Sequence, residues 1–517
     1  MIDIDGNKLT IQDVFDVAYK DEKVTISDVG IQNIERSHQT ILQILKKNEP
    51  VYGLNTGYGI FANQVISDED NEKLNRNLVI SHAVGTGEPL PREIVRAAML
   101  IRANALTKGF SGVRIELVIT LIQMLNCGLI PIVYSKGSLG SSGDLCMLAQ
   151  MALVLSMNGE GRELGCGFAE FSGQILSGTE AMKKAGIKRL VLSQKEGLAL
   201  INGATFSAAI LAVCLHQAEL LMKLADLSIS LSLEALIGRS EPFHEKLHLA
   251  RGLTGQIESA AQIRQNIDGS TLINSDPHVQ DAYSLRCAPQ VHGAVRDTLN
   301  FVSAILRKEI NAATDNPLIV DNDKALSGGN FHGEPVGMAA DFLSIALSEL
   351  AAISERRTFR LMDKNLNFGL KEMLVDPDSK EGLNSGIMML QYTAAALVLE
   401  NQTLSSPDSV HSLPTSANQE DHNANAYLAA FHCLEIVNNV TKVLAIELFS
   451  SCRAIGQRLR LQPDKILGKK TGLTFRLITQ FFPYKGDDAV WGEDIERFYK
   501  FLIKPSAFQD KIKEIMK

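Results

Sequence analysis

The sequence lacks the features that mark several classes of protein. The formal net charge is −8, and the sequence contains no run of lysine and arginine residues. We therefore expect no groove that binds a nucleic-acid backbone. Its seven cysteines are scattered and show no CxxC spacing, which favours reduced, mostly buried thiols. The N-terminus has no basic segment followed by an apolar stretch. We therefore expect no signal peptide and a cytoplasmic protein.

Long apolar runs without polar residues are also scarce. The most apolar segments, such as residues 387–399, contain Gln391 and fall short of the roughly 20 residues that cross the hydrocarbon core of a bilayer. We predict no membrane span. The composition, 45% hydrophobic and 21% charged, is that of a soluble globular protein, and a small molecule is the expected partner.

Helical periodicity dominates the chain. Residues 91–108 and the segment through Leu125 predict two helices, and five longer patterns predict a bundle core, because each is apolar on most faces. Those five patterns cover residues 205–236, 294–310, 338–361, 387–404 and 424–459. We expect a mainly α protein with a loop-rich N-terminal domain over 1–200, which carries the catalytic loops, and a long-helix bundle with a C-terminal helical extension over 201–517. Apolar faces this broad also favour contacts between subunits.

One motif suggests a metal site. Residues 244–248 read HExxH, which on a helix places two imidazoles on one face for zinc. Pro242 lies just upstream and no third ligand follows. A short surface helix with exposed histidines is the favoured interpretation.

A glycine-rich segment, Gly137 to Leu145, points to unusual chemistry. Gly143 has no side chain, so its amide nitrogen can approach the carbonyl carbon of Ser141 closely. Ring closure and loss of water from Ser142 would then give a methylidene-imidazolone, an electrophile that no standard side chain offers. The simpler alternative is a turn that caps the helix beginning near Leu145, with Asp144 or Ser142 as N-cap.

The chain resembles the family of histidine, phenylalanine and tyrosine ammonia-lyases. The matching segments follow the family's order from about residue 50 to 425. They are residues 52–59 (YGLNTGYG), 81–89, 137–145, 198–203 (LALING), 280–287 (QDAYSLRC), 314–317 (TDNP), 328–335 (GGNFHGEP) and 416–422 (SANQEDH).

This resemblance implies a mostly helical homotetramer whose active sites take loops from three subunits. It implies a methylidene-imidazolone made autocatalytically from Ser141, Ser142 and Gly143, without a metal. Tyr52 matches the family's base for the β-proton, and Arg286 matches the anchor of the substrate carboxylate.

Four further positions match the family's site. Asn202 and Tyr283 match the residues beside the electrophile, where Asn202 bonds the substrate or ring and Tyr283 supports proton transfer. Gln280 and Phe331 match the lining of the pocket.

Two positions indicate the substrate. His82 and Glu420 match residues of the histidine-specific members, and an imidazole, with one donor and one acceptor, pairs well with a carboxylate and a second imidazole. Glu420 is therefore expected both to bind substrate and to act in catalysis. We expect an ammonia-lyase that converts L-histidine to urocanate and ammonia.

The sequence also departs from the family near the expected pocket. Ser141 stands where Ala is usual, Met147 and Gln150 replace Pro and His, and residues 423–426 read NANA. These changes motivate two alternatives. One is a lyase that eliminates trimethylamine from a betaine such as ergothioneine without the electrophile, and the other is an aminomutase. A catalytically inactive scaffold is disfavoured because Tyr52 and Arg286 are present.

Overall fold

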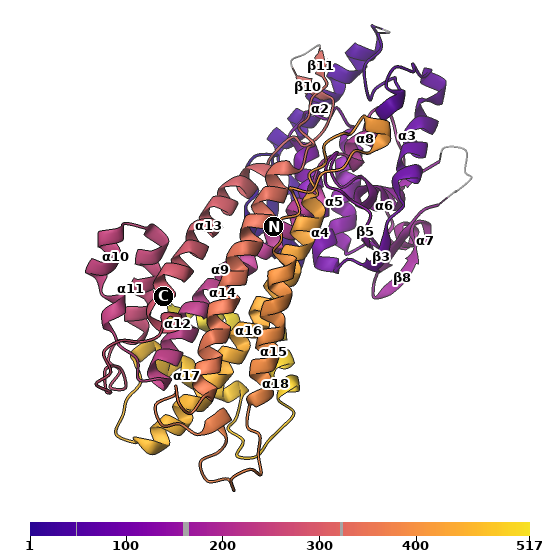
Figure 1. The fold of residues 1–517 in the computed structure, drawn as a ribbon. Coiled ribbons are helices and arrows are strands. Elements are labelled where there is room, and N and C mark those ends of the chain that lie inside the picture. Colours follow the sequence, from indigo (N-terminus) through magenta and orange to yellow (C-terminus); the bar gives the residue numbers. More distant parts are fainter. Residues whose placement is uncertain (48, 159–164, 321–323, 517) are drawn as a thin grey trace. The chain divides into compact units, whose positions relative to one another are not determined.

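The computed structural model describes residues 1–47, 49–158, 165–320 and 324–516 (Figure 1). In these ranges the chain forms nineteen α-helices, and its strands are only two to four residues long. The mainly α fold predicted from the sequence is confirmed. Contacts between residues divide the chain into two compact units. The first unit comprises residues 1–216, 303–341 and 407–431, and the second comprises residues 217–302, 342–406 and 432–517.

The first unit combines helices with five small sheets. β4, β7 and β8 form an antiparallel sheet, β3–β5 and β10–β11 are antiparallel pairs, and β1–β2 and β6–β9 are parallel pairs. The helices of this unit are α1 (Ile11–Lys20), α2 (Asp28–Leu45), α3 (Asp68–His82), α4 (Arg92–Thr107), α5 (Ile115–Cys127), α6 (Leu145–Leu155), α7 (Gly178–Ala185) and α8 (Glu196–Ile201). Its strands are β1 (Ile2–Ile4), β2 (Val24–Ile26), β3 (Thr86–Pro89), β4 (Ile130–Pro131), β5 (Tyr134–Lys136), β6 (Ser156–Met157), β7 (Phe168–Phe171), β8 (Gln174–Ser177), β9 (Leu190–Val191), β10 (Leu318–Val320) and β11 (Lys324–Leu326).

Helix α4 is the core element of the first unit. Every residue from Ile94 to Thr107 is buried, and the helix packs against α1 and α5. It begins after Pro91, whose ring fixes a backbone angle suited to a helix start, and it ends before Gly109, which has a left-handed φ of 81°. The helix predicted over residues 91–108 is therefore confirmed.

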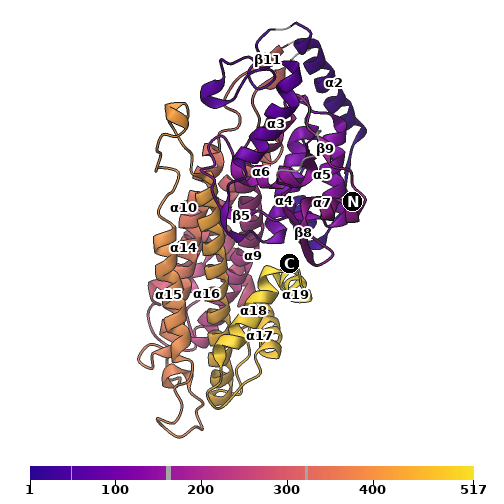
Figure 2. The same ribbon diagram turned by 90° about the vertical axis from the view of Figure 1, so that its right-hand side faces the viewer.

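Among its described residues, the regular elements of the second unit are all helices, joined by loops and by short 3₁₀ turns at Glu241–Phe243 and Glu372–Leu374. Its long helices run alongside one another (Figure 2), and a buried ion pair joins two of them, α14 (Glu334–Met362) and α16 (Ala426–Leu461). Arg357 on α14 donates from Nη2 to Oε2 of Glu447 on α16 at 2.7 Å. The helices confined to this unit are α10 (Glu245–Arg251), α11 (Thr254–Asn266), α12 (Tyr283–Arg286), α15 (Met388–Leu404), α17 (Lys469–Phe481), α18 (Trp491–Ile503) and α19 (Ala507–Met516).

Four long helices have residues in both units, which is why each unit is built from separate stretches of chain. They are α9 (Thr205–Ala235), α13 (Ala288–Glu309), α14 (Glu334–Met362) and α16 (Ala426–Leu461). All four were predicted from periodicity. The boundary predicted near residue 200 lies within the first unit, and the predicted two-domain division itself stays a prediction.

Three of these helices bear on the membrane prediction. α9, α14 and α16 are long and apolar enough to cross a bilayer, so the expectation that every apolar segment is too short was wrong. Their most apolar windows are 83%, 67% and 67% buried inside the protein. A helix that is apolar on most faces is expected to be buried among other helices, and the burial of these three helices agrees with that expectation.

The cysteines agree with the sequence-based expectation. None of the seven, all of which lie in the described ranges, forms a disulfide; four are buried, and Cys127 is exposed.

Candidate active site

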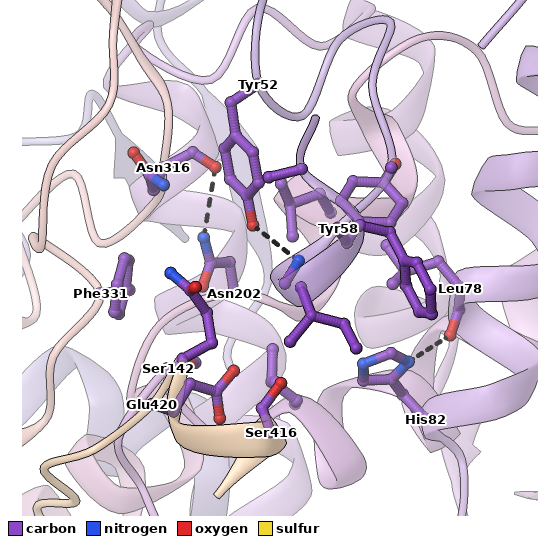
Figure 3. A pocket seen from close by; sticks show the side chains of 18 of the residues that line it. Tyr52, Tyr58, Leu78, His82, Ser142, Asn202, Asn316, Phe331, Ser416 and Glu420 are labelled. Atoms are coloured by element: carbon purple, nitrogen blue, oxygen red, sulfur yellow. Dashed lines mark hydrogen bonds between the residues drawn. The ribbon is translucent and has the colours of Figure 1, made fainter. Parts of the chain in front are cut away.

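Six loop and helix-end segments of the first unit surround a cavity of about 1330 Å³ (Figure 3). Seven of the residues predicted for the active site line it. They are Tyr52, His82, Ser141, Ser142, Asn202, Phe331 and Glu420. Segments that lie far apart in the sequence therefore meet at one cavity.

The backbone around Gly143 accepts only glycine. Gly143 has a φ of 90°, and a Cβ on it would lie 2.1 Å from the carbonyl carbon of Gly203. Two hydrogen bonds join the segment around Gly143 to the segment around Gly203. The Gly203 nitrogen donates to the Ser142 carbonyl at 3.1 Å, and the Asp144 nitrogen donates to the Gly203 carbonyl at 3.0 Å. This contact fixes the Ser141-Ser142-Gly143 turn against the start of α9.

Asp144 does not cap the helix that it precedes. Its buried carboxylate instead accepts from the backbone nitrogen of Ser207 at 2.8 Å, in the first turn of α9, and from the hydroxyl of Ser138 at 2.8 Å. Burial raises the pKa of Asp144 above its usual range, although these hydrogen bonds oppose the shift. One carboxylate thus connects the glycine-rich turn with the helix that follows Asn202.

Tyr52 reaches the cavity from the loop after α2. Its hydroxyl accepts a hydrogen bond from the Gly59 nitrogen at 3.5 Å, and Figure 3 places it near Asn202 and Glu420. Burial raises the pKa of Tyr52, and the negative charge of Glu420 raises it further. A base at this position therefore needs a positive charge nearby before it ionises at neutral pH.

His82 and Glu420 enter the same cavity from different elements. His82 ends α3, and its Nδ1 donates to the Leu78 carbonyl at 2.8 Å, which leaves Nε2 of the neutral ring as an acceptor. Glu420 accepts from the Thr415 hydroxyl at 3.1 Å. The cavity thus presents an imidazole nitrogen and a carboxylate, both suited to contact a second imidazole.

The loop that carries Glu420 has an unusual backbone. Ser416, Ala417 and Asn418 all have left-handed φ angles of 50–66°. Such angles are costly for residues other than glycine and tend to occur at functional sites. Nothing in the residue types of this loop predicted them.

Asn202 is almost fully buried at the base of the cavity, with 4% of its surface exposed. Its Nδ2 donates to Oδ1 of Asp315 at 3.2 Å, and Oδ2 of Asp315 accepts from Nζ of Lys195 at 2.6 Å. Sequence reasoning quoted Asp315 within a motif but missed this buried pair. The only signal in the sequence for this pair was the position of Lys195 directly before the apolar helix α8.

Three predicted site residues lie elsewhere in the chain. Gln280, Tyr283 and Arg286 belong to the second unit and are not among the residues that line this cavity. Tyr283 is 70% exposed, and the Arg286 guanidinium lies 4.6 Å from the centre of its ring.

The cavity also contains histidines that the sequence analysis did not assign. His332 and His422 stack with their ring centres 6.0 Å apart, and both line the cavity. Both lie inside quoted motifs, but their meeting depends on the fold.

The HExxH segment does not form a metal site. His244 is exposed as predicted, but His248 is buried, which corrects the prediction for that residue. The Nε2 of His248 bonds the Pro242 carbonyl, and its Nδ1 bonds Gln256. Over the described ranges, no group of three or more His, Cys, Asp or Glu side chains is arranged to hold a metal ion.

Comparison with known proteins agrees with this geometry. A family model described as aromatic amino acid lyase matches residues 9–479. The chain belongs to the aromatic amino acid lyase family. It is 49% identical to a histidine ammonia-lyase from Caldanaerobacter subterraneus, with 99% of this chain and 98% of the relative covered.

Two solved structures of the family share the fold. Histidine ammonia-lyase from Trypanosoma cruzi has a TM-score of 0.89 and 33% identity, and the match covers 99% of this chain and 95% of the other. The ergothioneine-degrading enzyme ergothionase from Treponema denticola has a TM-score of 0.87 and 29% identity, with 99% of each chain covered.

Proposed function

We propose that this lyase eliminates ammonia from L-histidine to give urocanate. The observation that carries the proposal is the meeting of His82 and Glu420 in the cavity that also contains Ser142. A neutral imidazole can donate to the carboxylate of Glu420 and exchange a second hydrogen bond with the ring of His82. The near full-length relative at 49% identity, named histidine ammonia-lyase, supports the same substrate.

The residues present fit a methylidene-imidazolone. Ser141, Ser142 and Gly143 would form the group, and the close approach of Gly143 to Gly203 leaves no room for a side chain at the ring nitrogen. The group supplies an electrophile that makes the amine a better leaving group. The proposed chemistry needs no metal.

The chain's own residues would bind the substrate and move the proton. The Tyr52 phenolate takes the proton from the β-carbon and becomes a phenol. The electron pair of the broken C–H bond forms the new double bond, and the amine nitrogen leaves the α-carbon with the electron pair of the C–N bond. Asn202 holds the amine end of the substrate, Phe331 packs against its apolar part, and Glu420 holds the imidazole.

We further propose a homotetramer with shared active sites. Gln280, Tyr283 and Arg286 would come from neighbouring subunits, with Gln280 lining the pocket, Tyr283 supporting proton transfer and Arg286 binding the substrate carboxylate. The positive charge of Arg286 would also lower the pKa of Tyr52, which burial and Glu420 raise. The 70% exposure of Tyr283 in the single chain supports this arrangement. We propose that the assembly is cytoplasmic.

The alternatives are not favoured. The ergothioneine-degrading relative is 29% identical, against 49% for the histidine ammonia-lyase. The discriminating experiment incubates the enzyme with L-histidine and, separately, with ergothioneine, and follows urocanate absorbance and trimethylamine. Urocanate from histidine supports the proposal, whereas trimethylamine from ergothioneine without any urocanate contradicts it.

A further inference from the structure

The carboxamide of Asn202 is oriented by its buried neighbours. Its Nδ2 donates to Oδ1 of Asp315 at 3.2 Å and lies 3.5 Å from the carbonyl of Asn316. Figure 3 draws the contact with the Asn316 carbonyl, and both hydrogen bonds of the Asn202 carboxamide use its nitrogen. Its oxygen is therefore the polar atom that remains to face the cavity.

Asp315 can orient an amide because it is a pure acceptor. An ionised carboxylate has no proton to donate, so it attracts the NH₂ group of Asn202 and repels the carbonyl oxygen. A protonated acid or an amide in its place would offer a donor as well, and the Asn202 carboxamide could then rotate by half a turn. A hydrogen bond to a charged group is stronger than one between neutral groups, so it favours one orientation of the carboxamide.

Lys195 keeps Asp315 ionised. The two side chains are 0% and 2% exposed, and Nζ lies 2.6 Å from Oδ2. Burial alone would raise the pKa of Asp315, but the charge and hydrogen bond of Lys195, together with a hydrogen bond from Ser111 and the charge of Arg102, hold that pKa below its usual value. A buried carboxylate without this partner would take up a proton and lose its purely accepting character.

The backbone beneath the pair is fixed as well. The buried guanidinium of Arg102 donates to the carbonyl of Asn202 and, at 2.8 Å, to the hydroxyl of Thr314. The amide and the carboxylate therefore sit on two chain segments joined by one side chain. Because the backbone cannot shift, the side-chain hydrogen bond determines the orientation of the amide.

We propose that Lys195 and Asp315 are positioning residues that hold the Asn202 carboxamide with its oxygen toward the cavity, where it accepts a hydrogen bond from the amino group of the substrate. This inference rests on the proposed amino acid lyase function. It does not depend on which side chain the substrate carries.

The test uses the full-length Ser142→Ala protein, which can bind an amino acid but cannot form the ring. In this background, Lys195→Met and Asp315→Asn are combined, because the double change removes both charges of the ion pair and leaves neither partner charged without the other. Calorimetry then gives the Kd of L-histidine and of imidazolepropionate, which is histidine without its amino group. L-phenylalanine and phenylpropionate form a second pair.

The expected result is a loss that depends on the amine. The double change should weaken binding of the amino acid about tenfold or more while leaving the Kd of the amine-free acid within about twofold. Equal losses for both ligands, or no loss for either, would overturn the proposal. Preference between the two amino acids tests the proposed substrate separately, so the two failures are distinguishable.

A neighbouring ion pair is the matched control. Glu196 is buried and accepts from Arg114 at 2.6 Å, next to Lys195 in sequence but without contact to Asn202. Arg114→Met with Glu196→Gln removes the same charges and should leave the ratio of the two Kd values unchanged. If this control variant changes the ratio as much as the Lys195→Met and Asp315→Asn variant does, the effect comes from a general loss of packing. That result would contradict the proposal.

Discussion

The hydroxyl of Ser141 accepts a hydrogen bond from the backbone nitrogen of Ala424, with 3.0 Å between the two atoms. Ser141 is the first residue of the triplet proposed to form the electrophile, and Ala424 follows the loop that carries Glu420. By the resemblance described for the sequence, both positions depart from the family's usual residues, and the structure brings the two positions into contact. The hydroxyl therefore connects the proposed electrophile to the proposed imidazole-binding loop.

Replacing Ser141 by Ala should weaken substrate binding without preventing ring formation. Cyclisation uses the carbonyl carbon of residue 141 and not its side chain, so intact mass should still show the loss of two waters. Losing one hydrogen bond should raise the KM for L-histidine about fivefold, with little change in kcat. Loss of the mass shift in Ser141→Ala would contradict this prediction.

Ser412 offers a second test of the same loop. Its hydroxyl accepts from the Asn423 nitrogen at 2.7 Å. Ser412→Ala should raise KM in the same direction as Ser141→Ala because both changes loosen residues 411–425. A rise confined to Ser141→Ala would mean that the effect acts on the electrophile rather than on the loop.

Replacing Ser142 by Ala should remove the electrophile itself. Intact mass should match the encoded sequence without loss of water, and the rate of urocanate formation should fall on the order of a thousandfold or more. Ser135→Ala, on strand β5 just before the glycine-rich turn, is the control and should keep both the mass shift and the rate. An unaffected rate in Ser142→Ala would contradict the proposed mechanism.

The long helices were predictable because their apolar residues recur with a helical period over many turns. The segment predicted over 205–236 is helix α9, Thr205–Ala235. The helix predicted from Ala294 begins earlier, at Ala288, because Pro289 lies in the first turn, where a missing backbone donor costs nothing.

The polar interior was much less predictable. Lys195 and Asp315 are 120 residues apart, and no periodic signal links them. Asp144 precedes a helix and reads as its cap, yet its carboxylate caps α9 because the turn at Gly143 brings Ser207 closer. Such contacts depend on how several loops meet in the folded chain. The family resemblance implied contacts only for the residues within its motifs.

The charge of Glu420 predicts a specific change in pH dependence. Because this carboxylate raises the pKa of Tyr52, Glu420→Gln should lower that pKa and increase the phenolate fraction at a given pH. The acid limb of kcat/KM for L-histidine, which reports ionisation of the base, should therefore move to lower pH, although the plateau falls as binding weakens. The measurement is the pH profile of kcat/KM. The pH at which the acid limb lies tests the electrostatic argument, whereas the value of the plateau does not.

Glu334 provides the matched control for that profile. Its carboxylate lies 4.0 Å from Nε2 of His422 and is not among the groups that shift the pKa of Tyr52. Glu334→Gln should leave the acid limb in place. An acid limb that moves upward in Glu420→Gln, or that moves equally in both variants, would refute the assignment of Tyr52 as the base influenced by Glu420.

Shared active sites predict complementation between two inactive variants. Tyr52→Phe removes the proposed base, and Arg286→Lys removes the planar donor pair proposed to bind the substrate carboxylate, so each homo-oligomer should be nearly inactive. If one site takes Tyr52 and Arg286 from different subunits, random mixed assemblies should have about a quarter of their sites intact. Co-expression with two affinity tags, purification through both and a urocanate assay measure this recovery. A mixed assembly that stays inactive would mean that both residues act within one protomer, or that Arg286 lies outside the site.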